Sequence, residues 1–209
     1  TLQNLTTKNA KDLHLRWSIY KNRLFADDNE LVATFEDAKA KTTCSSNGQT
    51  NVRQTLTVNN AAAWTAEEPN VYVVVGELMQ GKKVVETISF QTGFRTVEIK
   101  DTPASQDEFG LAGRYYYING KPVKLKGVNR HDTNPLTGKV ISREQMEREI
   151  MLMKRANINH VRTSHYPNDP YFYYLCNKYG IYLESEANIE SHEYFYGKAS
   201  LSHVPEFQA

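Results

Sequence analysis

The sequence predicts a multidomain β plus α/β protein: an immunoglobulin-like β-sandwich followed by the N-terminal βαβαβ part of a (β/α)8 TIM barrel. Two observations predict this fold class. Apolar and polar residues alternate with a period of two through roughly the first 100 residues, and strand and helix patterns alternate after them. The expected boundaries are 1–100 for the sandwich, 101–113 for a linker and 114–209 for a truncated TIM-barrel domain.

The composition is that of a globular protein, with 40% hydrophobic and 23% charged residues. A formal charge of +1 provides no basic excess for nucleic acid, and no run approaches the ~20 apolar residues of a membrane span. Cys44 and Cys176 are expected to be free thiols. Because the chain starts at Thr1 rather than Met, we expect the true N-terminus to lie elsewhere. The compartment, cytoplasmic or periplasmic, stays open.

Alternation predicts the strands of the first domain, with one side chain in two facing a core. Gln80-Gly81 separates two of these runs as a hairpin turn would, and no helical pattern intervenes. Several short strands in about 100 residues, with a polar insert at 39–51, fit an antiparallel sandwich. The positions that define these strands are Leu13, Leu15, Trp17 and Ile19, then Leu56 and Val58, then Val71, Val73 and Val75, and finally Val84, Glu86, Ile88 and Phe90.

Local signals delimit the elements of the second domain. Asn119-Gly120 predicts a type I′ hairpin turn, because both residues tolerate positive φ. Ser142 and Gln145 form a capping-box pattern that starts a helix over about 143–156. The branched residues at 158–163 predict a strand.

A second helix and a third strand follow. Asn168 or Asp169 caps this helix, Pro170 lies in its first turn, and Gly180 ends it before a strand at 181–185. Strand, helix, strand, helix, strand is the repeat of a parallel sheet. A closed barrel needs about 250 residues, so this domain is expected to be truncated.

Polar residues collect where each of these three strands ends. Loops that leave the carboxyl ends of barrel strands converge on one face, so the three groups should share a rim. Imidazoles, amides and carboxylates near aromatic rings are suited to the hydroxyls and C–H faces of a sugar. The three groups are Asn129, Arg130, His131 and Asp132; Ser164, His165 and Tyr166; and Glu186, Asn188, Glu190 and His192.

Each feature also has a structural interpretation. Arg130 could form an ion pair inside the barrel, and His165 could bond only the backbone. Glu184 and Glu186 lie two apart on one strand, so they cannot easily flank a scissile bond as acid and nucleophile. The run at 171–174 is expected to be helix surface and core packing. Glu190 with His192 is weak evidence for a metal site without a third ligand.

Three motifs resemble glycoside hydrolase family 2. They are Asn119-Gly120-Lys121-Pro122 with Lys126-Gly127-Val128-Asn129-Arg130-His131; Asn159-His160-Val161-Arg162-Thr163-Ser164-His165-Tyr166-Pro167; and Glu186-Ala187-Asn188-Ile189-Glu190-Ser191-His192. The third resembles a motif of the family's β-galactosidases. Trp64, Glu68-Pro69 and Gly93-Phe94-Arg95 look like marks of the sandwich that precedes the barrel in this family.

The resemblance implies a retaining β-galactosidase acting on a β-galactoside or oligosaccharide. It implies that His165 and His192 line the galactose pocket and that Asn129, Arg130 and His131 support it. The acid/base and nucleophile Glu would lie beyond Ala209, so the 209-residue chain should be inactive and contain no catalytic carboxyl. No cofactor is expected in this piece. Mg²⁺ is expected only in the parent enzyme, whose homo-oligomeric state stays open.

Two alternatives stay open. One is a β-glucuronidase or β-mannosidase of the same family. A glucuronidase would want a cationic partner for the sugar carboxylate, and none is evident in the sequence. The other is a non-catalytic carbohydrate-binding or structural module, which would lack an Asn-Glu pair after a fourth strand.

Overall fold

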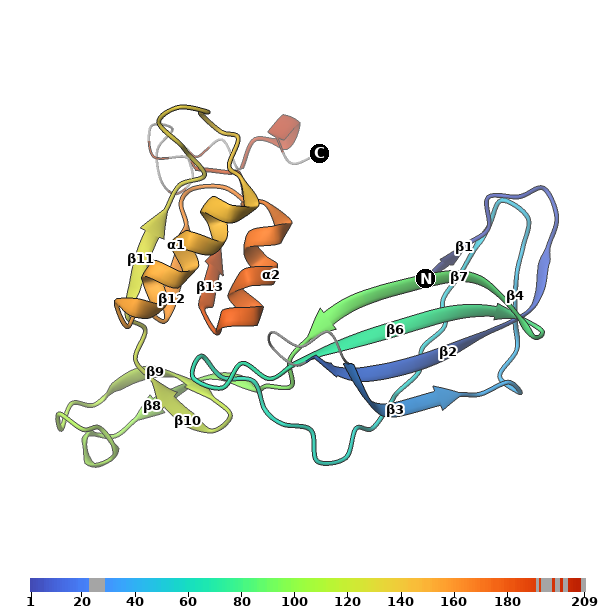
Figure 1. Ribbon diagram of the computed structural model, residues 1–209, viewed down its shortest axis with the longest axis horizontal. Coiled ribbons are helices and arrows are strands. Elements are labelled where there is room, and N and C mark those ends of the chain that lie inside the picture. The colour runs from blue at the N-terminus through green and yellow to red at the C-terminus, as the bar shows by residue number, and fades with distance from the viewer. Residues whose placement is uncertain (23–28, 191, 193–196, 198–199, 201–202, 208–209) are drawn as a thin grey trace. The chain divides into compact units, whose positions relative to one another are not determined.

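The computed structural model describes residues 1–22, 29–190, 192, 197, 200 and 203–207. Its contacts divide the chain into two compact units (Figure 1). The first contains Thr1–Trp64 and Asn70–Arg95, and the second contains Thr65–Pro69 and Thr96–Ala209. Among the described residues, no helix is long and apolar enough to cross a membrane.

The first unit is built on an antiparallel sheet of five strands, in the order β3-β2-β6-β7, with β4 paired to β2. The hairpin expected at Gln80-Gly81 is confirmed, because β6 and β7 pair around it and Gly81 has a φ of 58°. Two short strands, β1 and β5, form a separate pair. The strands are β1 (Leu2–Gln3), β2 (Ala10–Asn22), β3 (Asn29–Glu36), β4 (Thr42–Cys44), β5 (Gln49–Thr50), β6 (Val71–Gln80) and β7 (Lys83–Thr92).

The alternation in β6 was predicted correctly, but the face was wrong for two of its three positions. Val71 is buried as expected, whereas Val73 and Val75 are only partly buried and Tyr72 and Val74 join Ile19 in the buried cluster. The register explains the difference, because Val74 lies opposite Ile19 and therefore on the same face of the sheet.

The strand expected around Leu56 and Val58 is absent from the described residues. Both side chains pack against the cluster formed by Ile19, Tyr72 and Val74, but residues 51–58 form no strand pairing. Period-two alternation predicts an extended segment with one apolar side. It does not predict whether the backbone of that segment forms hydrogen bonds with a neighbouring strand.

The second unit begins with a three-stranded antiparallel sheet of β8 (Val97–Thr102), β9 (Gly113–Ile118) and β10 (Lys121–Val123). Asn119 and Gly120 have φ values of 51° and 76°, as the predicted I′ turn requires. A short 3₁₀ helix, η1 (Ala104–Gln106), lies between β8 and β9. The expected domain boundary at residue 100 falls inside β8, which pairs with β9 of the second unit.

The predicted βαβαβ segment is confirmed. Strands β11 (Gly127–Arg130), β12 (His160–Thr163) and β13 (Tyr182–Ser185) form a parallel sheet in that order. They are connected by α1 (Arg143–Arg155) and α2 (Pro170–Tyr179), and a short 3₁₀ helix, η5 (Pro205–Phe207), follows. The three strands form no closed barrel among the described residues.

Caps fix the ends of both helices. The Ser142 side chain accepts a hydrogen bond from Gln145 N at the start of α1. Asp169, rather than Asn168, caps α2 by accepting from Tyr171 N at 2.8 Å. Gly180 ends α2 in the left-handed region with a φ of 74°.

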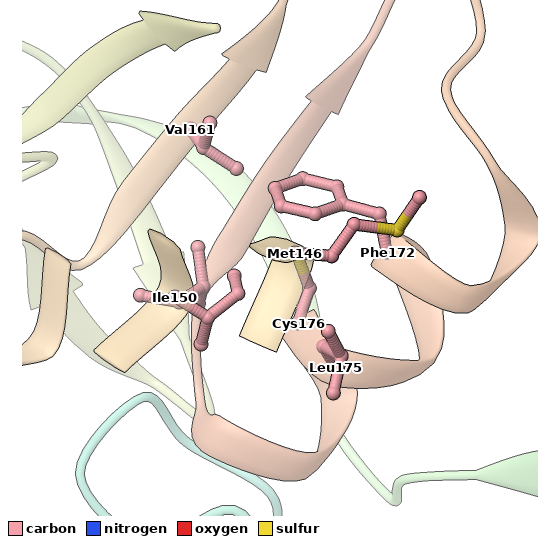
Figure 2. Packing of buried hydrophobic residues seen from close by; sticks show 7 residues of the cluster. Met146, Ile150, Val161, Phe172, Leu175 and Cys176 are labelled. Carbon is pink, nitrogen blue, oxygen red and sulfur yellow. The ribbon is translucent and has the colours of Figure 1, made fainter. Parts of the chain in front are cut away.

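The helices cover one face of the parallel sheet and form the core of the second unit (Figure 2). Val161 of β12 packs with α1 and α2 side chains, as Figure 2 shows, while Val128 and Leu183 pack against the edge of this cluster. The buried members are Met146, Ile150, Val161, Phe172, Leu175, Cys176 and Ile181. Because strand side chains alternate, Asn129, His160, Arg162 and Glu184 lie on the opposite face, called here the open face.

Both cysteines are buried free thiols, as predicted. Burial raises the pKa of the Cys176 thiol to about 12, so it stays protonated and inert at neutral pH.

Candidate functional site

The carboxyl ends of the three parallel strands bring imidazoles and carboxylates together. His131 follows β11, His165 follows β12 and Glu186 follows β13 directly. The rings of His131 and His165 meet edge to face with centroids 5.7 Å apart. These are the positions at which the sequence predicted a shared rim.

His165 makes polar contacts with three neighbouring side chains. Its Nδ1 lies 2.9 Å from Glu186 Oε2, 3.2 Å from Arg162 Nη2 and 3.5 Å from Glu190 Oε2. The side chain stays 37% exposed. The peptide bond that joins Ser164 to His165 is cis. Nδ1 is therefore engaged by the protein, and part of the ring remains accessible.

Arg162 holds the carboxylate that contacts His165. Its Nε donates to Glu186 Oε1 at 2.8 Å, and its Nη2 donates to the same oxygen. Burial raises the pKa of Glu186, but the hydrogen bonds from Arg162 and His165 outweigh this and hold the pKa below its ordinary value. Glu186 is therefore ionised at neutral pH.

Sequence reasoning did not single out Arg162 or His160. A signal was available, because the branched residues Val161 and Thr163 face the helices and so place 160 and 162 on the open face. Burial lowers the pKa of His160, and Glu184, 3.8 Å from its Nε2, partly opposes this. Arg162 Nη1 also donates to Asn129 Oδ1 at 3.5 Å, which brings Asn129 into the same group.

Arg130 points away from the open face. Its side chain is only 5% exposed, and Nε donates to Glu149 Oε2 of α1 at 2.7 Å. Nη1 donates to Asp132 Oδ1 and to Asn168 Oδ1, and the guanidinium lies 4.0 Å from the centroid of the Phe172 ring. These contacts favour the ion-pair interpretation of Arg130 over direct contact with a sugar.

Tyr166 anchors the loop that carries His131. Its hydroxyl accepts hydrogen bonds from Asp132 N at 3.1 Å and from Lys139 Nζ at 2.7 Å. Its ring also lies 6.4 Å from that of His131, measured between centroids. The loop after β11 is thus fixed by the segment after β12, which positions His131 beside His165.

His192 is connected to the site through Glu190. Glu190 Oε1 accepts from His192 N at 2.8 Å, while Oε2 faces His165. Ser191, which separates them, lies outside the described residues. Within the described part of the chain, no group of three or more His, Cys, Asp or Glu side chains could hold a metal ion.

Comparison with known proteins matches both units of the chain. Residues 4–95 match the model of glycosyl hydrolases family 2, and residues 110–204 match that of the family's TIM barrel domain. The chain belongs to glycosyl hydrolases family 2.

Relatives with similar sequences include β-galactosidases of Photobacterium profundum, 46% identical over 68% of this chain, and Priestia megaterium, 43% identical over 74%. The chain spans only 13% and 14% of their lengths. The crystal structure of a Bacteroides uniformis β-glucuronidase matches 88% of this chain and 20% of its own, with a TM-score of 0.70 and 27% identity.

Proposed function

We propose that this chain contributes part of the sugar-binding face of a retaining β-galactosidase-type glycosidase that hydrolyses terminal non-reducing β-D-galactose. The observation that carries the proposal is the pair of imidazoles, His131 and His165, held at the carboxyl edge of the parallel sheet with Glu186 behind them. The β-galactosidase relatives support the choice of sugar.

The proposed binding groups are His131, His165, His192 and Asn129. Accessible imidazoles and amides form directional hydrogen bonds to sugar hydroxyls. Bonds that tighten as the oxocarbenium-like transition state forms would accelerate the reaction, because catalysis depends on differential binding. Arg130 lies on the helix side of the sheet, where its hydrogen bonds to Glu149 and Asn168 hold the end of β11 in place.

The proposed mechanism needs two further carboxyl groups about 5 to 5.5 Å apart, one as acid/base and one as nucleophile. Glu186 does not suit either role, because Arg162 and His165 occupy its two oxygens. Glu184 lies beside it on the same face and within 4.0 Å of Arg162. We propose that both catalytic carboxyls come from outside these 209 residues and that the isolated chain does not hydrolyse glycosides.

A Mg²⁺ ion is proposed only for the whole protein. Mg²⁺ favours about six oxygen ligands in octahedral geometry, several of them waters. Among the described residues, no group of three or more His, Cys, Asp or Glu side chains could hold a metal ion.

A β-glucuronidase is the second candidate, because a structure with that activity matches the chain. It would need a cation for the sugar carboxylate. Arg162 is a cation on the open face, but it is already paired with the Glu186 carboxylate, whose Oε1 accepts from Arg162 Nε at 2.8 Å. This pairing favours a neutral sugar such as galactose.

The test is hydrolysis of chromogenic β-galactoside, β-glucuronide and β-mannoside by the 209-residue chain and by the protein that the complete gene encodes. Hydrolysis of the galactoside by the complete protein alone is the expected result. A preference for the glucuronide or mannoside would reassign the sugar. Hydrolysis by the 209-residue chain would show that carboxylates within it, such as Glu184, Glu186 or Glu190, are catalytic. No hydrolysis by either protein would favour a binding module.

A further inference from the structure

We infer that Glu186 is a positioning residue that holds His165 in the tautomer with the proton on Nδ1, leaving the Nε2 lone pair for a sugar hydroxyl. That the ligand of His165 is a sugar rests on the proposed function. The tautomer of His165 is argued from the hydrogen-bond geometry alone.

The two shortest contacts of His165 Nδ1 require opposite protonation states. Glu186 Oε2, at 2.9 Å, is an acceptor and requires a proton on Nδ1. Arg162 Nη2, at 3.2 Å, is a donor and requires a bare Nδ1. Only one of these contacts can be a hydrogen bond in a given state of the ring.

The partners of the neighbouring groups decide between them. Arg162 Nη2 already donates to Glu186 Oε1, so it does not depend on His165. Among the described contacts, Glu186 Oε2 accepts only from His165. A bare Nδ1 would place two lone pairs 2.9 Å apart, whereas a protonated Nδ1 forms a charge-assisted bond to an ionised carboxylate. The pKa of Glu186, held below its ordinary value, is consistent with that ionised form.

Arg162 and the backbone fix the carboxylate in place. Arg162 donates to Oε1 through both Nε and Nη2, and Glu186 N donates to Thr163 Oγ1 at 3.2 Å. The carboxylate therefore holds its orientation without depending on the imidazole. It can set the tautomer of His165 rather than follow it.

This tautomer has a chemical consequence for sugar recognition. With the proton on Nδ1, neutral His165 presents an acceptor at Nε2 and binds a hydroxyl that donates. With the proton on Nε2, the same ring would present a donor. Glu186 thus selects the polarity of the hydrogen bond that His165 offers.

The test measures the tautomer directly by long-range ¹H–¹⁵N NMR of the histidine side chains in the 209-residue chain without any sugar. The chain has 6 histidines, and a His165→Gln variant identifies the His165 signals. The wild-type protein should show a protonated Nδ1 and a bare Nε2.

Glu186→Gln should invert this pattern. Arg162 can only donate, so it will bind the amide oxygen and turn the amide NH₂ toward His165 Nδ1. The ring should then place its proton on Nε2. Glu190→Gln is the matched control, because Glu190 Oε2 is farther from Nδ1, at 3.5 Å, and this variant should keep the wild-type tautomer.

A wild-type His165 with its proton on Nε2 would overturn the inference. So would a Glu186→Gln variant that keeps the Nδ1 proton while its backbone spectrum shows a folded chain. If that variant does not fold, Glu186→Asp keeps the charge but withdraws the carboxylate from His165 Nδ1, while Arg162 Nη2, a donor, stays as its neighbour at 3.2 Å, and loss of the single Nδ1–H tautomer is expected. Retention of that tautomer in a folded Glu186→Asp chain would overturn the inference. Because no sugar is present, failure of the proposed galactoside specificity leaves these outcomes unchanged.

Discussion

The Nε atom of Arg130 lies 2.7 Å from Glu149 Oε2, and this ion pair joins the last residue of β11 to the middle of α1. Arg130 was predicted from the sequence to support a sugar pocket. The contact shows how such support would work, because the helix layer fixes the end of the strand that precedes His131.

Removing one partner of this pair should destabilise the chain. Arg130→Met leaves Glu149 and Asp132 without their buried cation and is expected to lower the free energy of unfolding by about 3 kcal/mol. Denaturant titration measures it. Arg114→Met is the control, because the Arg114–Asp101 pair is 70% and 78% exposed and should contribute less than about 1 kcal/mol. Equal effects of the two variants would contradict the role assigned to Arg130.

Phe172 is the largest fully buried side chain among the described residues. It packs with side chains of α1 and β12, among them Ile150 and Val161 (Figure 2). The Arg130 guanidinium also lies 4.0 Å from the centroid of its ring. Phe172→Ala should lower the free energy of unfolding by about 3–5 kcal/mol, because it removes apolar contacts and leaves a cavity. Tyr174→Ala, at a residue of the same helix that is 37% exposed, should cost clearly less in the same titration. A larger loss of unfolding free energy in Tyr174→Ala than in Phe172→Ala would contradict the assignment of Phe172 to the core.

Gly180 cannot accept a side chain. Its φ is 74°, and a Cβ there would lie 2.3 Å from the carbonyl oxygen of Ala66. Gly180→Ala is therefore expected to combine left-handed strain of about 1 kcal/mol with a backbone clash and to lower the melting temperature markedly. Gly110→Ala separates the two effects, since Gly110 has a φ of 67° and nothing within 4 Å of its Cβ position. Equal melting temperatures for the two variants would argue against the clash.

His160 should make the stability of the chain depend on pH near 6.5. Burial holds its pKa below that ordinary value, so the unfolded chain binds the proton more readily. The free energy of unfolding should therefore fall as pH falls through 6.5 toward the folded-state pKa. His160→Gln should flatten this dependence, measured by denaturant titration across the range.

Glu184→Gln provides the opposite change. It removes the carboxylate that partly offsets the burial of His160, so the same dependence should become steeper. If the free energy of unfolding depends on pH in both variants as it does in the wild-type chain, His160 is not the cause of that dependence.

The second unit could be predicted closely because its signals are local. Ser142, Asp169 and Gly180 specify helix ends through their own side chain or φ angle, whatever the rest of the chain does. The shared rim followed from the rule that parallel strands end on one face, and His131 and His165 do meet there.

What the sequence did not reveal depended on tertiary partners. Which face of β6 is buried follows from its register with β2, and that register cannot be read from alternating valines alone. The function of Arg162 likewise depends on Glu186, which lies 24 positions further along the chain. Arg130 and Arg162 both lie on strands of the parallel sheet, and their partners differ, because Arg130 pairs with Glu149 of α1 and Arg162 pairs with Glu186 on the open face.

The most direct test of the sugar-binding account is the kcat/KM for a chromogenic β-galactoside of a His165→Phe variant of the protein that the complete gene encodes. The substitution removes a proposed hydrogen bond to the sugar that strengthens in the transition state, and kcat/KM should fall about tenfold to a hundredfold. His203→Gln, at an exposed histidine that is not among the proposed sugar-binding groups, should match the wild-type protein. An unchanged kcat/KM in the His165→Phe variant would contradict the claim that this rim binds the sugar.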